Sequence, residues 1–338
     1  MIYNNAFLDR LHIGLTSLLP QWGFGTDSRL TLLTISENAT FKVEEISSDR
    51  RLILRVHRPG YSIPAEIESE LQWLHAVKNQ GEINVAASVP MVNGEHIAEL
   101  RDGDRSIWVV GFEFISGREP GNDADLIHWY RRLGETAGHL HHHSQHWVRP
   151  EGFTRKTWRF DTIIGQRSFW GDWRALEQFT PCEIALLSQV EGSVRSQLDA
   201  YGESEGRFGL VHSDMRLANL LVEGDRLAVI DFDDCGICWF GWDFATAVSF
   251  IEDDARLSEY CRAWVEGYRQ VRSFSSSDEQ MLSVLVMLRR LQLTAWIASH
   301  SETPTAQQFM PGWGVNTLML ARKYLDNELI ENENLQDA

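Results

Sequence analysis

The sequence predicts an α+β fold in two lobes, an N-terminal antiparallel sheet with one helix and a mainly helical C-terminal lobe. Short β-branched and apolar runs fill the first third of the chain, and helical patterns dominate the rest. A Gly/Pro-containing stretch at residues 116–121 separates the two patterns. The length of 338 residues also favours about two domains. We therefore expect one lobe at residues 1–116 and the other at residues 117–338.

The N-terminal lobe has the pattern of strands interrupted by one helix. Strand-like runs occur at residues 30–35, 40–43, 52–56, 96–100 and 106–115. The last two flank Asp102-Gly103-Asp104, which predicts a hairpin. From Pro64 onward, apolar residues recur at the spacing of one helical face, namely Ile67, Leu71, Leu74 and Val77.

The C-terminal lobe is predicted to be mainly helical. Helical patterns cover residues 123–146, 181–201, 257–271, 278–298 and 317–329. Between the second and third of these, residues 209–232 contain apolar runs on both sides of Glu223-Gly224-Asp225. This arrangement predicts a tight hairpin in the middle of the lobe.

Composition excludes several classes of function. Acidic residues outnumber basic ones by 48 to 31, and a net charge of −17 argues against nucleic acid or an anionic membrane as the main partner. Four cysteines in a chain of this length do not make a disulfide framework. We find no signal-peptide pattern and no apolar run of the ~18 residues that a membrane span needs. We expect a soluble protein of the cytoplasm.

The segment VHSDMRLANLLVEGDRLAVIDFDD, residues 211–234, carries the chemistry. His212 and Asp214 are followed by Asn219, then by the predicted hairpin and by Asp231 at a strand end. Phosphoryl transfer needs a carboxylate that orients the acceptor hydroxyl, and oxygen ligands that hold Mg²⁺ against nucleotide phosphates. The ordered set supplies both, provided that residues 214, 219 and 231 converge around one cation.

This segment resembles the aminoglycoside phosphotransferase and choline kinase-like family, which has a protein-kinase-like fold. Residues 230–245, IDFDDCGICWFGWDFA, look most like the bacterial branch with type II homoserine kinase and the Cpx stress-response kinase. The resemblance covers residues 28–300 and is specific for fold and reaction type, but not for the substrate.

The resemblance implies roles for the residues of this segment. Asp214 is expected to be the catalytic base, and Asn219 and Asp231 are expected to hold the metal ions. Asp233 is either an extra metal ligand or the cap of the next turn. Arg216 is either a stabiliser of charge on the transferred phosphate or a solvent-exposed loop residue.

Two further residues are expected to be structural. By the same resemblance, His212 and Asp243 are expected to brace the catalytic loop rather than to take part in the chemistry.

The N-terminal lobe offers weaker signals for nucleotide binding. Asn38 and Thr40 lie where a kinase has its phosphate-covering loop, but the glycines are missing, and an ordinary hairpin turn is the alternative. Arg55 stands where the family usually has a Lys that touches the α- and β-phosphates. Its expected partner is Glu70, with Glu66 as the second choice.

The hinge between the lobes is expected at residues 112–116. The resemblance implies that the Glu113 carbonyl and the Ile115 N–H bond the adenine edge. Because this contact is made by the main chain, side-chain identity hardly tests it.

Other patterns carry less weight. His142 and His146 are one helical turn apart, but an amphipathic helix explains them better than a zinc site. Cys235 and Cys238 form a lone CxxC, for which packing is the simpler reading. The tryptophans of residues 170–173 and 239–242 suit either a core or an acceptor pocket, and residues 150–180 are our expected source of acceptor contacts.

The resulting hypothesis is an ATP- and Mg²⁺-dependent phosphotransferase that acts on a hydroxyl of a small metabolite. An amino alcohol, a hydroxy amino acid and an aminoglycoside-like compound are all open as acceptors. One alternative is a protein Ser/Thr kinase, although only residues 235–241 separate DFDD from WDFA, too few for an evident activation segment. The other is a pseudokinase scaffold, which the missing Lys supports.

Overall fold

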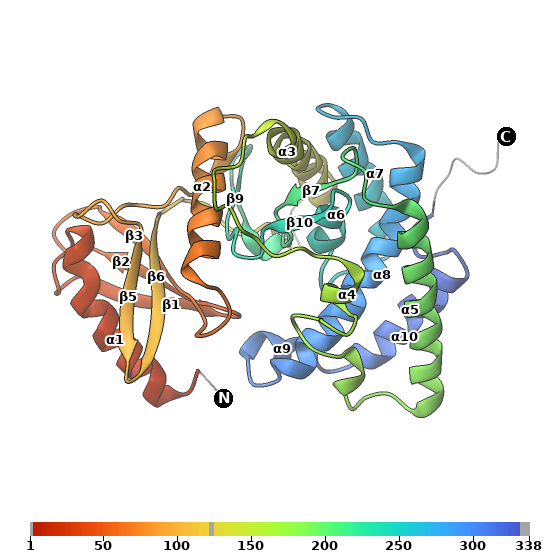
Figure 1. Ribbon diagram of the computed structural model, residues 1–338, viewed down its shortest axis with the longest axis horizontal. Coiled ribbons are helices and arrows are strands. Elements are labelled where there is room, and N and C mark those ends of the chain that lie inside the picture. The colour runs from red at the N-terminus through yellow and green to blue at the C-terminus, as the bar shows by residue number, and fades with distance from the viewer. Residues whose placement is uncertain (1–2, 122–124, 332–338) are drawn as a thin grey trace. The chain divides into compact units, whose positions relative to one another are not determined.

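The computed structural model describes residues 3–121 and 125–331, which divide into two compact units. The first unit extends to Ser116 and also includes the short segments 150–154 and 302–305, and the second unit contains the rest. Figure 1 labels the helices and strands. The mixture of an N-terminal antiparallel sheet and a helical C-terminal part confirms the predicted fold class.

The first unit is built on a five-stranded antiparallel sheet in the order β1-β2-β3-β6-β5. The strands are β1 (Arg29–Ile35), β2 (Ala39–Glu44), β3 (Arg51–Val56), β5 (Ile97–Asp102) and β6 (Arg105–Glu113), with a short β4 (Asn84–Val85) outside this sheet. The predicted β5–β6 hairpin is present, and Gly103 adopts the positive φ of 62° that its turn requires. The predicted helix is α2 (Pro64–Gln80).

The expectation of one helix in this unit is incomplete, because α1 (Asn5–Leu18) precedes the sheet. The Asn4 side chain caps its first turn by accepting from the Phe7 N–H at 2.9 Å. A short 3-10 turn, η1 (Leu19–Trp22), continues α1. The helix forms because its apolar residues share one face that the sheet covers.

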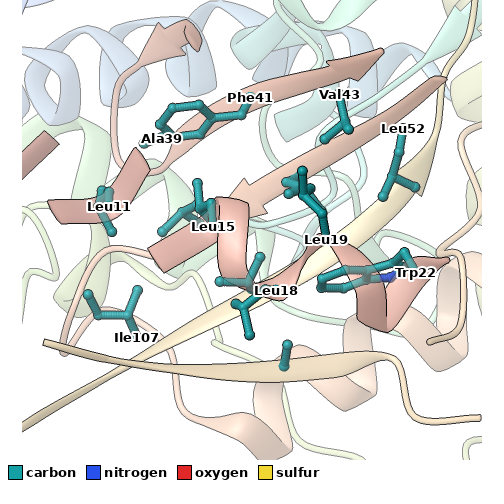
Figure 2. Close-up of a cluster of buried hydrophobic side chains, with 14 of the residues drawn as sticks. Leu11, Leu15, Leu18, Leu19, Trp22, Ala39, Phe41, Val43, Leu52 and Ile107 are labelled. Carbon is teal, nitrogen blue, oxygen red and sulfur yellow. The ribbon is translucent and has the colours of Figure 1, made fainter. Parts of the chain in front are cut away.

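The core of the first unit lies between α1 and one face of the sheet (Figure 2). Strand β2 alternates buried and half-buried residues, so Ala39, Phe41 and Val43 point into this core. In β3 the corresponding residues are Leu52, Leu54 and Val56. Arg55 therefore projects from the opposite face of the sheet, which positions it for a partner on α2.

The second unit is mainly helical, as predicted. Its longer helices are α3 (Leu126–His146), α5 (Pro181–Tyr201), α7 (Leu257–Arg269), α8 (Ser276–Ser299) and α10 (Trp313–Leu325). Shorter ones are α4 (Phe160–Ile163), α6 (Trp242–Ala247) and α9 (Pro304–Phe309), with 3-10 turns η2 (Trp173–Ala175) and η3 (Leu217–Asn219). The predicted central hairpin is β8 (Leu220–Glu223) with β9 (Arg226–Val229), and β7 (Phe208–Val211) pairs with β10 (Gly236–Trp239).

Two close approaches organise this unit. Helices α3 and α7 cross at Gly134 and Gly267, where an added Cβ would lie 1.9 Å from a carbonyl oxygen of the other helix.

Helix α8 is the one described helix whose length and composition would suffice for a membrane span, but 89% of that window is buried inside the protein. It is therefore a core helix, and its two central arginines, Arg289 and Arg290, are both buried.

Candidate active site

The predicted catalytic loop, residues 212–219, follows β7. Asp243, at the start of α6, holds the main chain of this loop by hydrogen bonds. The Asp243 carboxylate accepts from the His212 N–H at 3.1 Å and from the Ser213 N–H at 2.7 Å. Ser213 adopts a φ of 72°, which a residue other than glycine seldom adopts. The predicted bracing role of Asp243 is therefore confirmed by its contacts.

His212 links this loop to the strand end before Asp231. The Asp214 N–H donates to His212 Nδ1 at 3.2 Å, so this nitrogen is the unprotonated one, and Nε2 donates to the Ile230 carbonyl at 3.1 Å. Both ring nitrogens are thus engaged by the main chain. These contacts confirm the expectation that His212 is structural.

A second buried histidine supports Asp243 from α3, and the sequence analysis did not identify it. His141 Nε2 lies 2.9 Å from Asp243 Oδ2, and Nδ1 lies 2.9 Å from the Tyr268 hydroxyl. Burial lowers the pKa of His141, although its bond to Asp243 acts in the opposite direction. The ring is therefore neutral, and it fixes the carboxylate that fixes the loop.

Asp214 is held by three side-chain donors. Its Oδ1 accepts from Arg289 Nη2 at 2.7 Å, and its Oδ2 accepts from Asn219 Nδ2 at 2.8 Å and from Arg216 Nε at 3.2 Å. Burial alone would raise the pKa of Asp214, but the charges of Arg216 and Arg289 outweigh burial and hold the pKa below its usual value. Asp214 is an ionised, oriented carboxylate whose side chain keeps 16% exposure.

Arg289 is the residue of this cluster that sequence reasoning missed. It comes from α8, and its guanidinium also donates to Ser249 Oγ at 3.0 Å and to Gln292 Oε1 at 2.9 Å. The same group lies 5.1 Å from the ring centre of Trp170. The available signal was a pair of arginines inside the apolar run LVMLRRLQL, since charges there must be buried and paired.

Asn219 and Asp231 have the chemistry of a magnesium site. The Asn219 amide nitrogen is used by Asp214, so its amide oxygen points the other way, and the Asn219 carbonyl accepts from the Ile230 N–H at 3.0 Å. Asp231 therefore follows directly on a residue bonded to Asn219, with a φ of 64°. No three His, Cys, Asp or Glu side chains among residues 3–121 and 125–331 form a metal site. One amide and one carboxylate fit Mg²⁺, which takes its remaining ligands from phosphates and water.

The roles of the neighbouring charges stay predictions. Arg216 is partly exposed and pairs with Asp214. Asp233 is buried, and its carbonyl accepts from the Arg155 guanidinium. Asp234 lies 4.0 Å from Lys156 Nζ. The structure thus places Arg155 on the main chain of Asp233 and Lys156 near the carboxylate of Asp234.

In the first unit, Arg55 pairs with Glu70 as predicted. Arg55 Nη2 lies 2.7 Å from both carboxylate oxygens, and the two side chains are 5% and 0% exposed. The Phe112 ring lies 4.7 Å from the guanidinium carbon. The alternative partner Glu66 instead accepts from the Ile63 N–H at 3.3 Å, at the start of α2. Whether Arg55 contacts phosphate stays a prediction.

The other expected nucleotide contacts lie at the ends of sheet strands. Asn38 is buried in the β1–β2 turn, where its side-chain oxygen accepts from the Arg58 N–H at 3.1 Å. Thr40 lies two residues further on, in β2, where it pairs with Arg55 of β3. Glu113 ends β6, and its side chain pairs with Lys78 at 2.9 Å. Ile115 lies in the irregular segment that follows, so its main chain is outside the sheet ladder.

The patterns given less weight are explained by packing. His142 is exposed, and its carbonyl accepts from His146 Nδ1 at 2.8 Å within α3. Cys235 and Cys238 are buried, and burial raises the pKa of the Cys238 thiol. The four tryptophans at positions 170, 173, 239 and 242 are each at most 6% exposed. The expected acceptor role of residues 150–180 is not tested by these contacts.

Comparison with known proteins finds a matching family model and several similar proteins. A family model described as "phosphotransferase enzyme family" matches residues 31–274. The structure of the microcompartment-associated aminopropanol kinase is 39% identical, covers 94% of this chain and 98% of its own, and superposes with a TM-score of 0.86. Amicoumacin kinase of Bacillus subtilis (strain 168) is 22% identical over 80% of each chain. Amicoumacin kinase hAmiN, at 18% identity over 98% of this chain and 96% of its own, shares the fold with a TM-score of 0.73.

Proposed function

The chain belongs to the phosphotransferase enzyme family, and from that premise we propose that it transfers the γ-phosphate of ATP to the hydroxyl of a small amino alcohol. The observation that carries the proposal is the Asp214 carboxylate, fixed on both oxygens and adjacent to Asn219. Such a carboxylate can accept a hydrogen bond from an acceptor hydroxyl and take its proton as the O–P bond forms.

The acceptor class is inferred from the aminopropanol kinase. Its 39% identity extends over nearly the whole of both chains, which supports a shared substrate class as well as a shared fold. An amino alcohol is a cation near neutral pH, and the net charge of −17 favours the approach of a cation. The sequence left hydroxy amino acids and aminoglycoside-like acceptors open, and the comparison favours the simple amino alcohol.

ATP and a divalent cation complete the proposal. Amicoumacin kinase hAmiN was solved with AMP-PNP and Ca²⁺, an ATP analogue and a divalent metal. In this chain Asn219 and Asp231 would hold Mg²⁺, with Asp233 as a further candidate. When bound, Mg²⁺ screens the negative charge of the phosphates and so favours attack by the hydroxyl.

Two positive side chains, Arg55 and Arg216, are available to the phosphates. Arg55, held rigid by Glu70, replaces the usual Lys and can bond phosphate through its fork of donors. Arg216 bonds Asp214 through its Nε, and it is our candidate for stabilising the negative charge on the transferred phosphate. Asn38 and Thr40 are proposed phosphate-loop residues, and the Glu113 carbonyl and Ile115 N–H are proposed adenine contacts. Arg155 and Arg289 instead stabilise the loops themselves.

A coupled assay tests the proposal. Purified protein with Mg-ATP should release ADP in the presence of 1-amino-2-propanol, and mass spectrometry should find the phosphorylated amino alcohol. The matched controls are 1-aminopropane, which lacks the hydroxyl, and 2-propanol, which lacks the amine. ADP release that is equal with and without every amino alcohol tested would contradict the acceptor class.

The alternatives have less support. The relatives named above are small-molecule kinases, which disfavours a protein acceptor, and generic protein acceptors in the same assay would reveal one. The pseudokinase hypothesis depended on the missing Lys, but Arg55 retains the buried ion pair with the helix Glu. The proposed site of the reaction is the cytoplasm, where ATP is available.

A further inference from the structure

We propose that Arg289 is a positioning residue for phosphoryl transfer, which holds the Asp214 carboxylate in its productive orientation. The inference rests on the proposed function and adds a residue that lies 75 positions away from Asp214 in sequence. Its basis is a set of contacts that join four segments of the second unit at one buried guanidinium.

The donors to Asp214 are divided between its two carboxylate oxygens. Asn219 and Arg216 both approach Oδ2, whereas Arg289 alone among the described side-chain donors bonds Oδ1. The two donors on Oδ2 restrain rotation about the Cβ–Cγ bond through one oxygen only. A donor on the second oxygen fixes that torsion, and therefore the direction in which the lone pairs meet an acceptor hydroxyl.

Arg289 is itself held in place on every branch of its guanidinium. Its side chain is 3% exposed, and each branch of the guanidinium has its own partner: Asp214, Ser249 and Gln292. The rings of Trp170 and Trp242 lie 5.1 Å and 5.9 Å from its central carbon. A group clamped in this way transmits the position of α8 and of the Trp170 segment to the reacting carboxylate.

Arg289 differs from its neighbour on α8, Arg290, in what it contacts. Arg290 is equally buried on the same helix, but its partners are Glu252, Thr317 and the Trp313 carbonyl, and it does not contact the catalytic loop. Burial in α8 therefore does not by itself explain why Arg289 faces Asp214. Arg290 also provides a matched control for the loss of a buried arginine.

The experiment compares R289M, R289K and R290K in the full chain, with Mg-ATP and 1-amino-2-propanol. We expect R289M to lower kcat by about 10²-fold, with an unchanged KM for ATP, because a carboxylate about 1 Å out of place costs a factor of that size. R289K should recover part of kcat, since an ammonium can reach Asp214 but cannot bond Ser249 and Gln292 as well. R290K should lower the melting temperature and leave kcat unchanged.

The inference is wrong if R289M has the wild-type kcat, or if R290K loses as much kcat as R289K. Should R289M fail to fold, the comparison of R289K with R290K decides the matter alone. A wild-type protein that is inactive with every amino alcohol refutes the proposed function instead. A crystal structure of R289K then still tests the inference, because the Asp214 carboxylate should be rotated about its Cβ–Cγ bond relative to the wild type.

Discussion

The two units each contain an arginine–carboxylate pair with a buried arginine, and the two pairs differ in how their donors and acceptors are shared. In the first unit, both oxygens of Glu70 accept from one nitrogen of Arg55, and both side chains are almost completely buried. In the second unit, the Asp214 side chain is 16% exposed and accepts hydrogen bonds from three donors. The Arg289 guanidinium in turn donates to three partners. In the first pair one guanidinium nitrogen bonds both carboxylate oxygens. In the second pair the carboxylate has three donors and the guanidinium has three partners.

This contrast predicts that replacing a carboxylate by an amide lowers turnover in the second unit and stability in the first. Asp214→Asn should lower turnover by about 10²- to 10⁴-fold, because the amide cannot take the proton of the acceptor hydroxyl. Binding of Mg-ATP should be retained, since Asn219 and Asp231 are unchanged. Turnover and nucleotide affinity can be measured by ADP release and by titration calorimetry. Wild-type turnover in this variant would remove Asp214 from the chemistry.

The corresponding change in the first unit should appear in stability. Glu70→Gln leaves the Arg55 charge buried without its counter-charge, which we expect to cost about 3–5 kcal/mol in the free energy of unfolding. Glu68→Gln is the matched control, since it makes the same change on the exposed face of α2 and should stay within about 0.5 kcal/mol. Urea unfolding measures both. Equal effects at the two positions would show that the Arg55–Glu70 pair is not a stabilising feature.

The two pairs also differ in how far the sequence could predict them. Arg55 and Glu70 are 15 residues apart, on a strand and the next helix, and the family resemblance, which implies a basic residue on this strand paired with a Glu of the next helix, was enough to match them. Asp214 and Arg289 are 75 residues apart, and α8 is buried on all its faces, so it has no amphipathic stripe that would mark a functional face. Only the presence of two charges in an apolar helix indicated that something was paired there.

Distance along the sequence also explains why other parts of the structure were missed. The loop motif identified Asp214, Asn219, Asp231 and the brace Asp243, because their spacing is local. His141 was hidden among six histidines of α3, and its function depends on a contact with a residue 102 positions away. Helix α1 was missed because the sheet that its apolar residues contact comes later in the chain. Local order was therefore predictable, and the support that distant helices give to the loop was not.

Strain in the catalytic loop predicts a smaller and opposite effect. Ser213 has a φ of 72°, and its buried hydroxyl has no hydrogen-bond partner among the residues that the structure describes. Ser213→Gly should therefore raise the free energy of unfolding by about 1 kcal/mol, because glycine adopts this conformation without strain. Ser213→Ala removes the hydroxyl but keeps the Cβ, so it separates the two causes. A less stable S213G would show that Ser213 is not strained.

The last difference between the two pairs is their dependence on pH. Asp214 is fixed through Asp243, which is bonded to the neutral ring of His141, whereas both oxygens of Glu70 accept from Arg55. Burial lowers the pKa of His141 in the folded protein, and the nearby Arg272 acts in the same direction. The unfolded chain therefore takes up a proton first as the pH falls below about 6.5, and stability is lost from that pH downward. His141→Gln should flatten the dependence of the melting temperature on pH between about 6.5 and 5, relative to the wild type. The exposed control His142→Gln should leave that slope unchanged, and an equal slope in all three proteins would exclude His141 as its source.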